Sequence, residues 1–100
     1  MTPEILFNCC TRLQEPDWTQ FKAIHISGCI DGGEYIEAGQ PAASAEFFGI
    51  YGIHHSGEAE AITDTTAGAD LAEAEVIAAA LSARSDLPVE LHPALKEPSA

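Results

Sequence analysis

The sequence predicts a single two-layer α+β domain: an antiparallel sheet of four to five strands, a C-terminal helix packed on one face, and a short N-terminal helix. Hydrophobic residues make up 46% of the 100 residues, which is enough to build one modest core. Two pairs of β-rich segments flank glycine-containing turns, and an amphipathic segment follows them. No linker interrupts the chain, so residues 1–100 are expected to form one domain.

The N-terminal helix is predicted by Thr2, Pro3 and Glu4, which are residue types typical of the N-cap, the first helical position and the first turn. Apolar residues recur at helical spacing through residues 6–13. The helix is therefore expected to continue to that point and to stop before Pro16.

A first β-hairpin is predicted over residues 18–37. Residues 18–30 are rich in β-formers, residues 31–33 supply an Asp-Gly-Gly turn, and residues 34–37 form the return strand. Residues 39–44 are expected to be a connecting loop.

A second hairpin is predicted from a highly apolar strand at residues 47–54, a turn at 55–57 and a partner strand at 58–64. The strand at 47–54 carries apolar side chains of both parities, which is typical of a central strand.

The C-terminal helix is predicted over residues 70–84. Asp70 and Glu73 form a capping box, and Arg84 suits the negative C-terminal end of the helix. One apolar stripe follows helical spacing: Leu71, Ala74, Ile77, Ala78 and Leu81. Residues 87–91 are expected to form a short strand, placed at a sheet edge by Pro88. Residues 93–100 are expected to be a flexible tail.

The charge balance is the most informative feature for function. The chain has 16 Asp and Glu against 4 Lys and Arg, a net charge of −12. This excludes direct nucleic-acid binding and docking on an anionic membrane, because both need clustered basic residues. No apolar run is long enough for a membrane span and no signal-peptide pattern is present, so a cytoplasmic location is expected.

The cysteines and histidines do not follow a catalytic or metal-binding pattern. The three cysteines are an odd number without a CxxC spacing, which disfavours both a disulfide framework and a metal site. Cys29 and His25 share a strand, but no third orienting group accompanies them. The sequence therefore predicts no catalytic residue, no metal and no cofactor. A small enzyme using Cys29 or Cys10 with a histidine is kept as an alternative.

Ten acidic residues fall between residues 31 and 75, with no Lys or Arg among them. Solubility alone is one explanation. The more specific hypothesis is that carboxylates on alternate strand residues, about 6.8 Å apart, imitate the phosphate spacing of a nucleic-acid strand and fill a basic protein groove. The candidate partner-binding residues are Glu34, Glu37, Glu58, Glu60, Asp64, Asp70, Glu73 and Glu75.

The apolar segment from Phe48 to Ala59, the sequence Ile62-Thr63-Asp64-Thr65 and the alanine- and glutamate-rich helix after it resemble small acidic phage-encoded anti-CRISPR proteins that inhibit type I systems. The resemblance covers residues 47–84. It implies an inhibitor in the bacterial cytoplasm that binds a CRISPR-Cas surveillance complex and blocks target DNA binding. A non-catalytic oligomeric module is the alternative; in it Phe47, Tyr51 and Ile53 pack on a second copy. A homodimer is compatible with both hypotheses.

Overall fold

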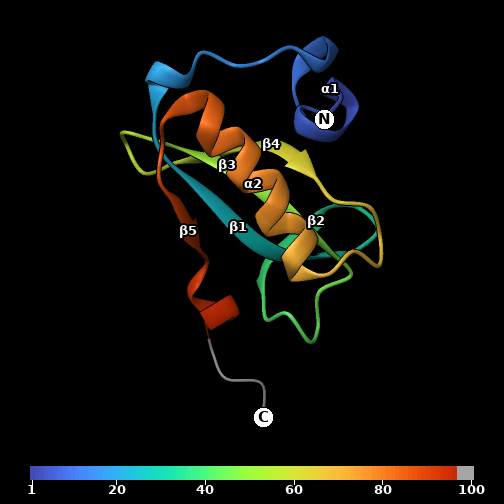
Figure 1. Cartoon of the computed structure of the whole chain (residues 1–100). Coiled ribbons are helices and arrows are strands. Elements are labelled where there is room, and N and C mark those ends of the chain that lie inside the picture. Colours follow the sequence, from blue (N-terminus) through green and yellow to red (C-terminus); the bar gives the residue numbers. More distant parts are fainter. Residues whose placement is uncertain (97–100) are drawn as a thin grey trace.

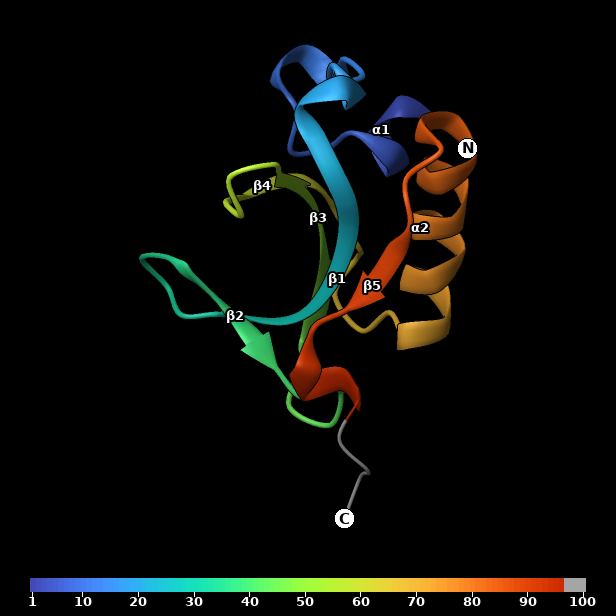
Figure 2. The ribbon, with the colours of Figure 1, turned by 90° about the vertical axis from the view of Figure 1, so that its left-hand side faces the viewer.

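The computed structural model describes residues 1–96 and confirms the predicted α+β class. A five-stranded sheet carries helix α2 on one face, and the short helix α1 lies beside α2 (Figure 1). The strand order is β2-β1-β3-β4, with every pair antiparallel. β5 pairs in parallel with Ile24–Ile26 of β1, on the side where β2 pairs only with Gly28–Asp31. The sheet is curved, and its concave face points away from α2 (Figure 2).

The first hairpin pairs β1 (Phe21–Asp31) with β2 (Ile36–Gln40). Its turn is fixed by the Asp31 carboxylate, which accepts a hydrogen bond from the Gly33 N–H at 2.9 Å. The hairpin is confirmed, but its first strand begins at Phe21 and not at Trp18, because Trp18–Gln20 forms a 3₁₀ helix capped by the Asp17 side chain. β2 begins later than predicted and continues into the expected loop. Gly28 permits this pairing, because a Cβ at that position would lie 2.3 Å from the Gln40 carbonyl oxygen.

The second hairpin pairs β3 (Phe47–His54) with β4 (Ala59–Asp64). β3 lies between β1 and β4, so the prediction of a central strand is confirmed. Its bounds match the predicted range, because apolar contacts are available on both faces of the strand.

Helix α2 (Leu71–Ser85) closes the core. The predicted cap is present: the Asp70 Oδ1 accepts a hydrogen bond from the Glu73 N–H at 2.9 Å. The buried part of the predicted stripe packs on β1 and β3, whereas Leu71 and Ile77 are only partly buried. The fully buried contacts join Ala74, Ala78 and Leu81 of α2 to Ile24, Ile26, Ile50 and Ile62 of the sheet. No helix in residues 1–96 is both long enough and apolar enough to cross a lipid bilayer.

The C-cap of α2 gives a stability prediction. Asp86 adopts a left-handed conformation with φ 61°, and its N–H donates to the Ser82 carbonyl. A non-glycine residue in this region is strained, and a carboxylate opposes the negative end of the helix dipole. Asp86→Gly is therefore expected to raise the free energy of unfolding by about 0.5 to 1 kcal/mol. Thermal unfolding measures this change, and a lower melting temperature would contradict it.

The N-terminal helix is shorter than predicted: α1 covers Pro3–Leu6 only. The chain then leaves the helix because Asn8 forms two hydrogen bonds of 2.8 Å with the Asp64 backbone, one to the N–H and one to the carbonyl. The Cys9 N–H also donates to the Ile62 carbonyl. These bonds cover part of the outer edge of β4 and outweigh the helical pattern of residues 6–13, which continues only as a 3₁₀ helix at Thr11–Leu13.

The C-terminal segment corrects a second prediction. After β5 (Val89–Leu91), Pro93–Lys96 forms a 3₁₀ helix, η3, and buries Leu95 in the core. The predicted tail is therefore wrong for residues 93–96, because Leu95 has an apolar site to fill. Residues 97–100 lie outside the described residues. β5 pairs with β1 alone, which agrees with the edge position predicted from Pro88.

Candidate functional site

The acidic residues are distributed unevenly along strand β1, and many of them lie near its C-terminal end. The eleven residues of β1 span about 33 Å along the strand, at about 3.3 Å per residue. The Asp31 N–H, at the C-terminal end of β1, donates to the Glu46 Oε1 at 2.9 Å, and the Glu46 carbonyl accepts from the Gly68 N–H in the loop before α2. These contacts join the first hairpin to the start of α2. We call the chain segments beside the C-terminal half of β1 the acidic end, with the first hairpin on the side of the sheet away from α2 (Figure 2). Its residues are Asp31, Glu34, Glu37, Glu46, Asp64, Asp70, Glu73 and Glu75.

Six of the eight predicted partner-binding residues thus lie at the acidic end, whereas Glu58 and Glu60 do not. Glu58 and Glu60 follow the β3–β4 turn. Phe21, the first residue of β1, pairs with His54 at this turn, so the turn lies at the opposite end of β1. Glu60 also faces an imidazole there, with 3.4 Å between its Oε1 and the His54 Nε2.

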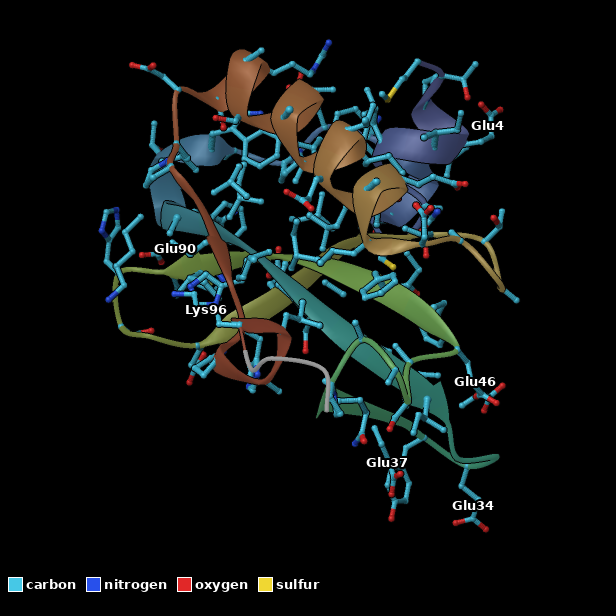
Figure 3. All side chains as sticks on the ribbon, turned by 60° about the horizontal axis from the view of Figure 1, so that its bottom comes forward. Glu4, Glu34, Glu37, Glu46, Glu90 and Lys96 are labelled. Carbon is cyan, nitrogen blue, oxygen red and sulfur yellow. The ribbon has the colours of Figure 1, made fainter. Side chains whose placement is uncertain are left out.

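The basic residues lie away from the exposed acids of the first hairpin. Lys22 is at the start of β1, and Arg84, in the last turn of α2, forms an ion pair with Glu15 at 2.7 Å. Figure 3 shows Glu34, Glu37 and Glu46 gathered at one end, with Lys96 at a distance from them. Among the described residues, no carboxylate at the acidic end forms an ion pair with a Lys or Arg.

The acidic residues at this end differ in their structural roles. Asp31, Glu46 and Asp70 accept hydrogen bonds from backbone N–H groups and so stabilise turns and the helix start. Asp64 is half-buried, and this burial raises its pKa, although a hydrogen bond from Cys9 opposes the shift. The exposed carboxylates without such a role are Glu34, Glu37, Glu73 and Glu75. Asp31 and Glu46 were not among the predicted residues, and only the pairing of distant segments brings them here.

The carboxylates come from turns, strand ends and the first two turns of α2. Of the predicted residues, only Glu37, Glu60 and Asp64 lie within strands, and they belong to two different strands. A β-bulge also separates Glu60 from Asp64. The acidic end therefore presents a group of carboxylates and not a single row of alternate strand residues.

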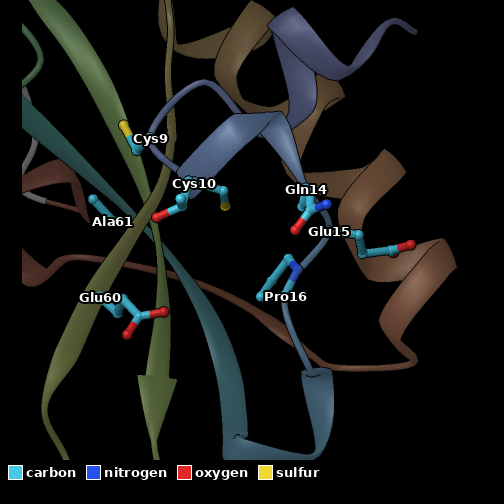
Figure 4. Close-up of a pocket in the computed structure, with 8 residues that line it drawn as sticks. Cys9, Cys10, Gln14, Glu15, Pro16, Glu60 and Ala61 are labelled. Atoms are coloured by element: carbon cyan, nitrogen blue, oxygen red, sulfur yellow. The ribbon is translucent and has the colours of Figure 1, made fainter.

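A groove of about 350 Å³ contains the two adjacent cysteines (Figure 4). Burial, with a smaller effect of the Asp64 charge, raises the pKa of Cys9 to about 12, and burial raises the pKa of Cys10. The Cys10 thiol donates to the Ile62 carbonyl at 3.6 Å. These shifts are opposite to those of a nucleophilic cysteine, whose pKa is lowered.

Cys29 and His25 do not form a pair. They lie four residues apart on β1, about 13 Å along the strand. The His25 Nε2 instead contacts the Glu90 Oε1 at 2.8 Å, and the Cys29 Sγ lies 3.6 Å from the Tyr51 hydroxyl. Residues 1–96 contain no group of three His, Cys, Asp or Glu side chains arranged to hold a metal ion.

The raised pKa of Cys9 predicts a slow thiol. At pH near 8 we expect iodoacetamide to alkylate folded Cys9 about tenfold to a hundredfold more slowly than the same cysteine in denaturant, because the smaller thiolate fraction outweighs the higher nucleophilicity of a thiolate with a raised pKa. Peptide mapping by mass spectrometry measures the rate at each cysteine. Equal rates in the folded and denatured protein would contradict the described environment of Cys9.

No protein-family model, curated protein or solved structure matches this chain.

Proposed function

We propose that the protein is a non-catalytic binding protein whose acidic end occupies a basic surface of a partner protein. The observation that supports this proposal most directly is the gathering of six predicted carboxylates at one end, away from Lys22 and Arg84. The anti-CRISPR resemblance of residues 47–84 supplies the partner in this proposal: a type I surveillance complex in the bacterial cytoplasm, at the surface that receives target DNA.

Electrostatics supports such a role in two ways. A net charge of −12 produces self-repulsion that lowers folding stability. The same negative charge attracts a basic partner surface, so it contributes to binding. The same field steers the protein toward a basic groove and accelerates association. Because the turn at Asp31 and Gly33 is already hydrogen-bonded, binding there would need little ordering of the backbone.

The salt dependence of binding tests the electrostatic part of this proposal. Purified type I surveillance complexes are immobilised, and the dissociation constant of the protein is measured between about 50 and about 200 mM salt. We expect affinity to fall by at least about tenfold over this range, since the attraction between exposed charges is screened. An affinity that does not change with salt would contradict an electrostatic interface.

A second candidate function is a homo-oligomeric module, favoured by the open face of the sheet. Phe47, Tyr51 and Ile53 alternate along β3 on the face opposite α2. Light scattering tests this second candidate: a protein that stays monomeric as its concentration is raised contradicts the module, whereas a dimer is compatible with both candidates.

A further inference from the structure

The concave face of the sheet contains a cavity that the proposed function does not use. It has a volume of about 300 Å³, at the lower limit of small-molecule sites. Tyr51 and Ile53 line the cavity and alternate along β3 with the core residues Phe48 and Ile50, so the cavity lies on the face of the sheet away from α2. Its walls come from β1, β2, β3, β4 and the segment after β5, and the residues that carry its chemistry are His25, Ser27, Gly39, Tyr51, Ile53 and His92.

Tyr51 provides an aromatic surface in this cavity. Its ring folds back over Gly49, where an added Cβ would lie 2.8 Å from Cε1 and 2.9 Å from the hydroxyl oxygen. Glycine at position 49 therefore allows the ring to lie along the sheet. Tyr51 is the register partner of His25 across β3 and β1, and its hydroxyl lies 3.6 Å from the Cys29 Sγ. An aromatic surface of this kind suits stacking by a flat ligand.

The hydrogen bonds of His92 fix which of its nitrogens can donate. The Ala94 N–H donates to the His92 Nδ1 at 3.1 Å, so the neutral ring carries its proton on Nε2. Gly39 has φ +78°, and a Cβ there would lie 3.5 Å from the His92 Cε1 and Nε2. The His92 ring edge that carries the N–H thus borders the cavity, where the absence of a side chain at position 39 leaves space.

His25 supplies the complementary group. Its Nε2 contacts the Glu90 carboxylate at 2.8 Å, and a carboxylate accepts a hydrogen bond, so the proton is on Nε2. In the neutral ring Nδ1 is then an acceptor. Ser27 is already engaged, because its hydroxyl accepts the Gly39 N–H at 2.8 Å and donates to the Gly28 carbonyl at 3.5 Å. The cavity therefore offers one donor, on His92, and one acceptor, on His25.

Charge limits the ligand further. No Lys, Arg, Asp or Glu lines the cavity, so no Lys or Arg charge is available there for a phosphate or a carboxylate, and the net charge of −12 repels anions. The apolar part of the lining, Ala38, Ile53 and Ala59, favours a ligand with a hydrophobic body.

We propose that this concave cavity binds a small, uncharged, planar nitrogen heterocycle that stacks on Tyr51, accepts a hydrogen bond from the His92 Nε2–H and donates one to the His25 Nδ1. The proposal stands on the cavity, the two imidazoles and the ring over Gly49, and does not rest on the proposed function of the acidic end.

Adenine is a suitable probe, because it is uncharged at neutral pH and has ring acceptors beside an amino donor. We expect NMR titration of the full chain to give saturable shifts at Tyr51, Ile53 and Gly39, with a dissociation constant of about 1 mM. Adenosine 5′-monophosphate should bind more weakly, because its phosphate meets the negative field of the protein. No saturable shift with adenine, or stronger binding of the monophosphate, would overturn the proposal.

Single substitutions test whether the adenine-induced shifts arise from binding in this cavity. Ala59→Phe places a ring in the cavity from an exposed position and should abolish the shifts, whereas Val76→Phe on the exposed side of α2 is the matched control and should leave them unchanged. His92→Phe keeps the ring but removes the donor, and should weaken binding about threefold to tenfold. Unchanged binding in Ala59→Phe, or a stable dimer that buries this face, would contradict the assignment.

Discussion

Leu81→Ala is expected to lower the free energy of unfolding by about 3 kcal/mol, within the range of about 2 to 5 kcal/mol for buried leucines. Leu81 has no exposed surface and packs from α2 onto the sheet residues of the core. The alanines at positions 74 and 78 bring the helix backbone close to the sheet, so Leu81 is the largest fully buried side chain that α2 contributes. Its loss leaves a cavity that neighbouring alanines cannot fill.

Urea unfolding followed by circular dichroism measures this change. Val76→Ala is the control on the same helix, because Val76 is 58% exposed and its truncation should cost less than about 0.5 kcal/mol. A similar small effect of both substitutions would mean that α2 does not close the core as described.

The charge-reversing double variant Glu34→Lys with Glu37→Lys is expected to weaken binding to the proposed basic partner by at least about tenfold, or about 1.4 kcal/mol. Both carboxylates are exposed and lie at the acidic end, so the change removes attraction and adds repulsion without altering the core. The matched control is Glu58→Lys with Glu60→Lys, which makes the same change in net charge at the opposite end of β1.

Binding by both variants is measured on the same immobilised complex. We expect the control to be clearly less affected than the variant at the acidic end. Equal losses would mean that the partner responds to total charge and not to one end of the molecule. A larger loss in the control would place the interface at the β3–β4 turn instead.

The elements that the sequence predicted well are those with local or self-contained signals. Strand β3 has apolar residues of both parities, and α2 has its own cap at Asp70, so neither depends on knowing a distant neighbour. The start of the N-terminal helix also has a local signal, the N-cap and first-turn residues Thr2, Pro3 and Glu4. The helix ends early because the Asn8 side chain hydrogen-bonds to the backbone of Asp64. A contact between residues 56 positions apart has no signal in a single sequence.

The candidate site was predictable in composition but not in arrangement. The ten acids between residues 31 and 75 are visible in the sequence, whereas their separation into an acidic end and the Glu58–Glu60 turn depends on strand order. His25 and His92 are even less accessible to prediction. They line the same cavity because β5 pairs in parallel with β1 and is followed by η3, a pairing that no local pattern indicates.

Competition with target DNA tests the proposed function most directly. A fluorescent target duplex is first bound to a surveillance complex. The amount of duplex that stays bound is then measured as the protein is added. We predict that the protein displaces the duplex, and that the variant reversed at Glu34 and Glu37 does so only at much higher concentration. If the protein binds the complex while the duplex stays bound, or if no type I complex binds it, the proposal that its acidic end fills a DNA-receiving surface is contradicted.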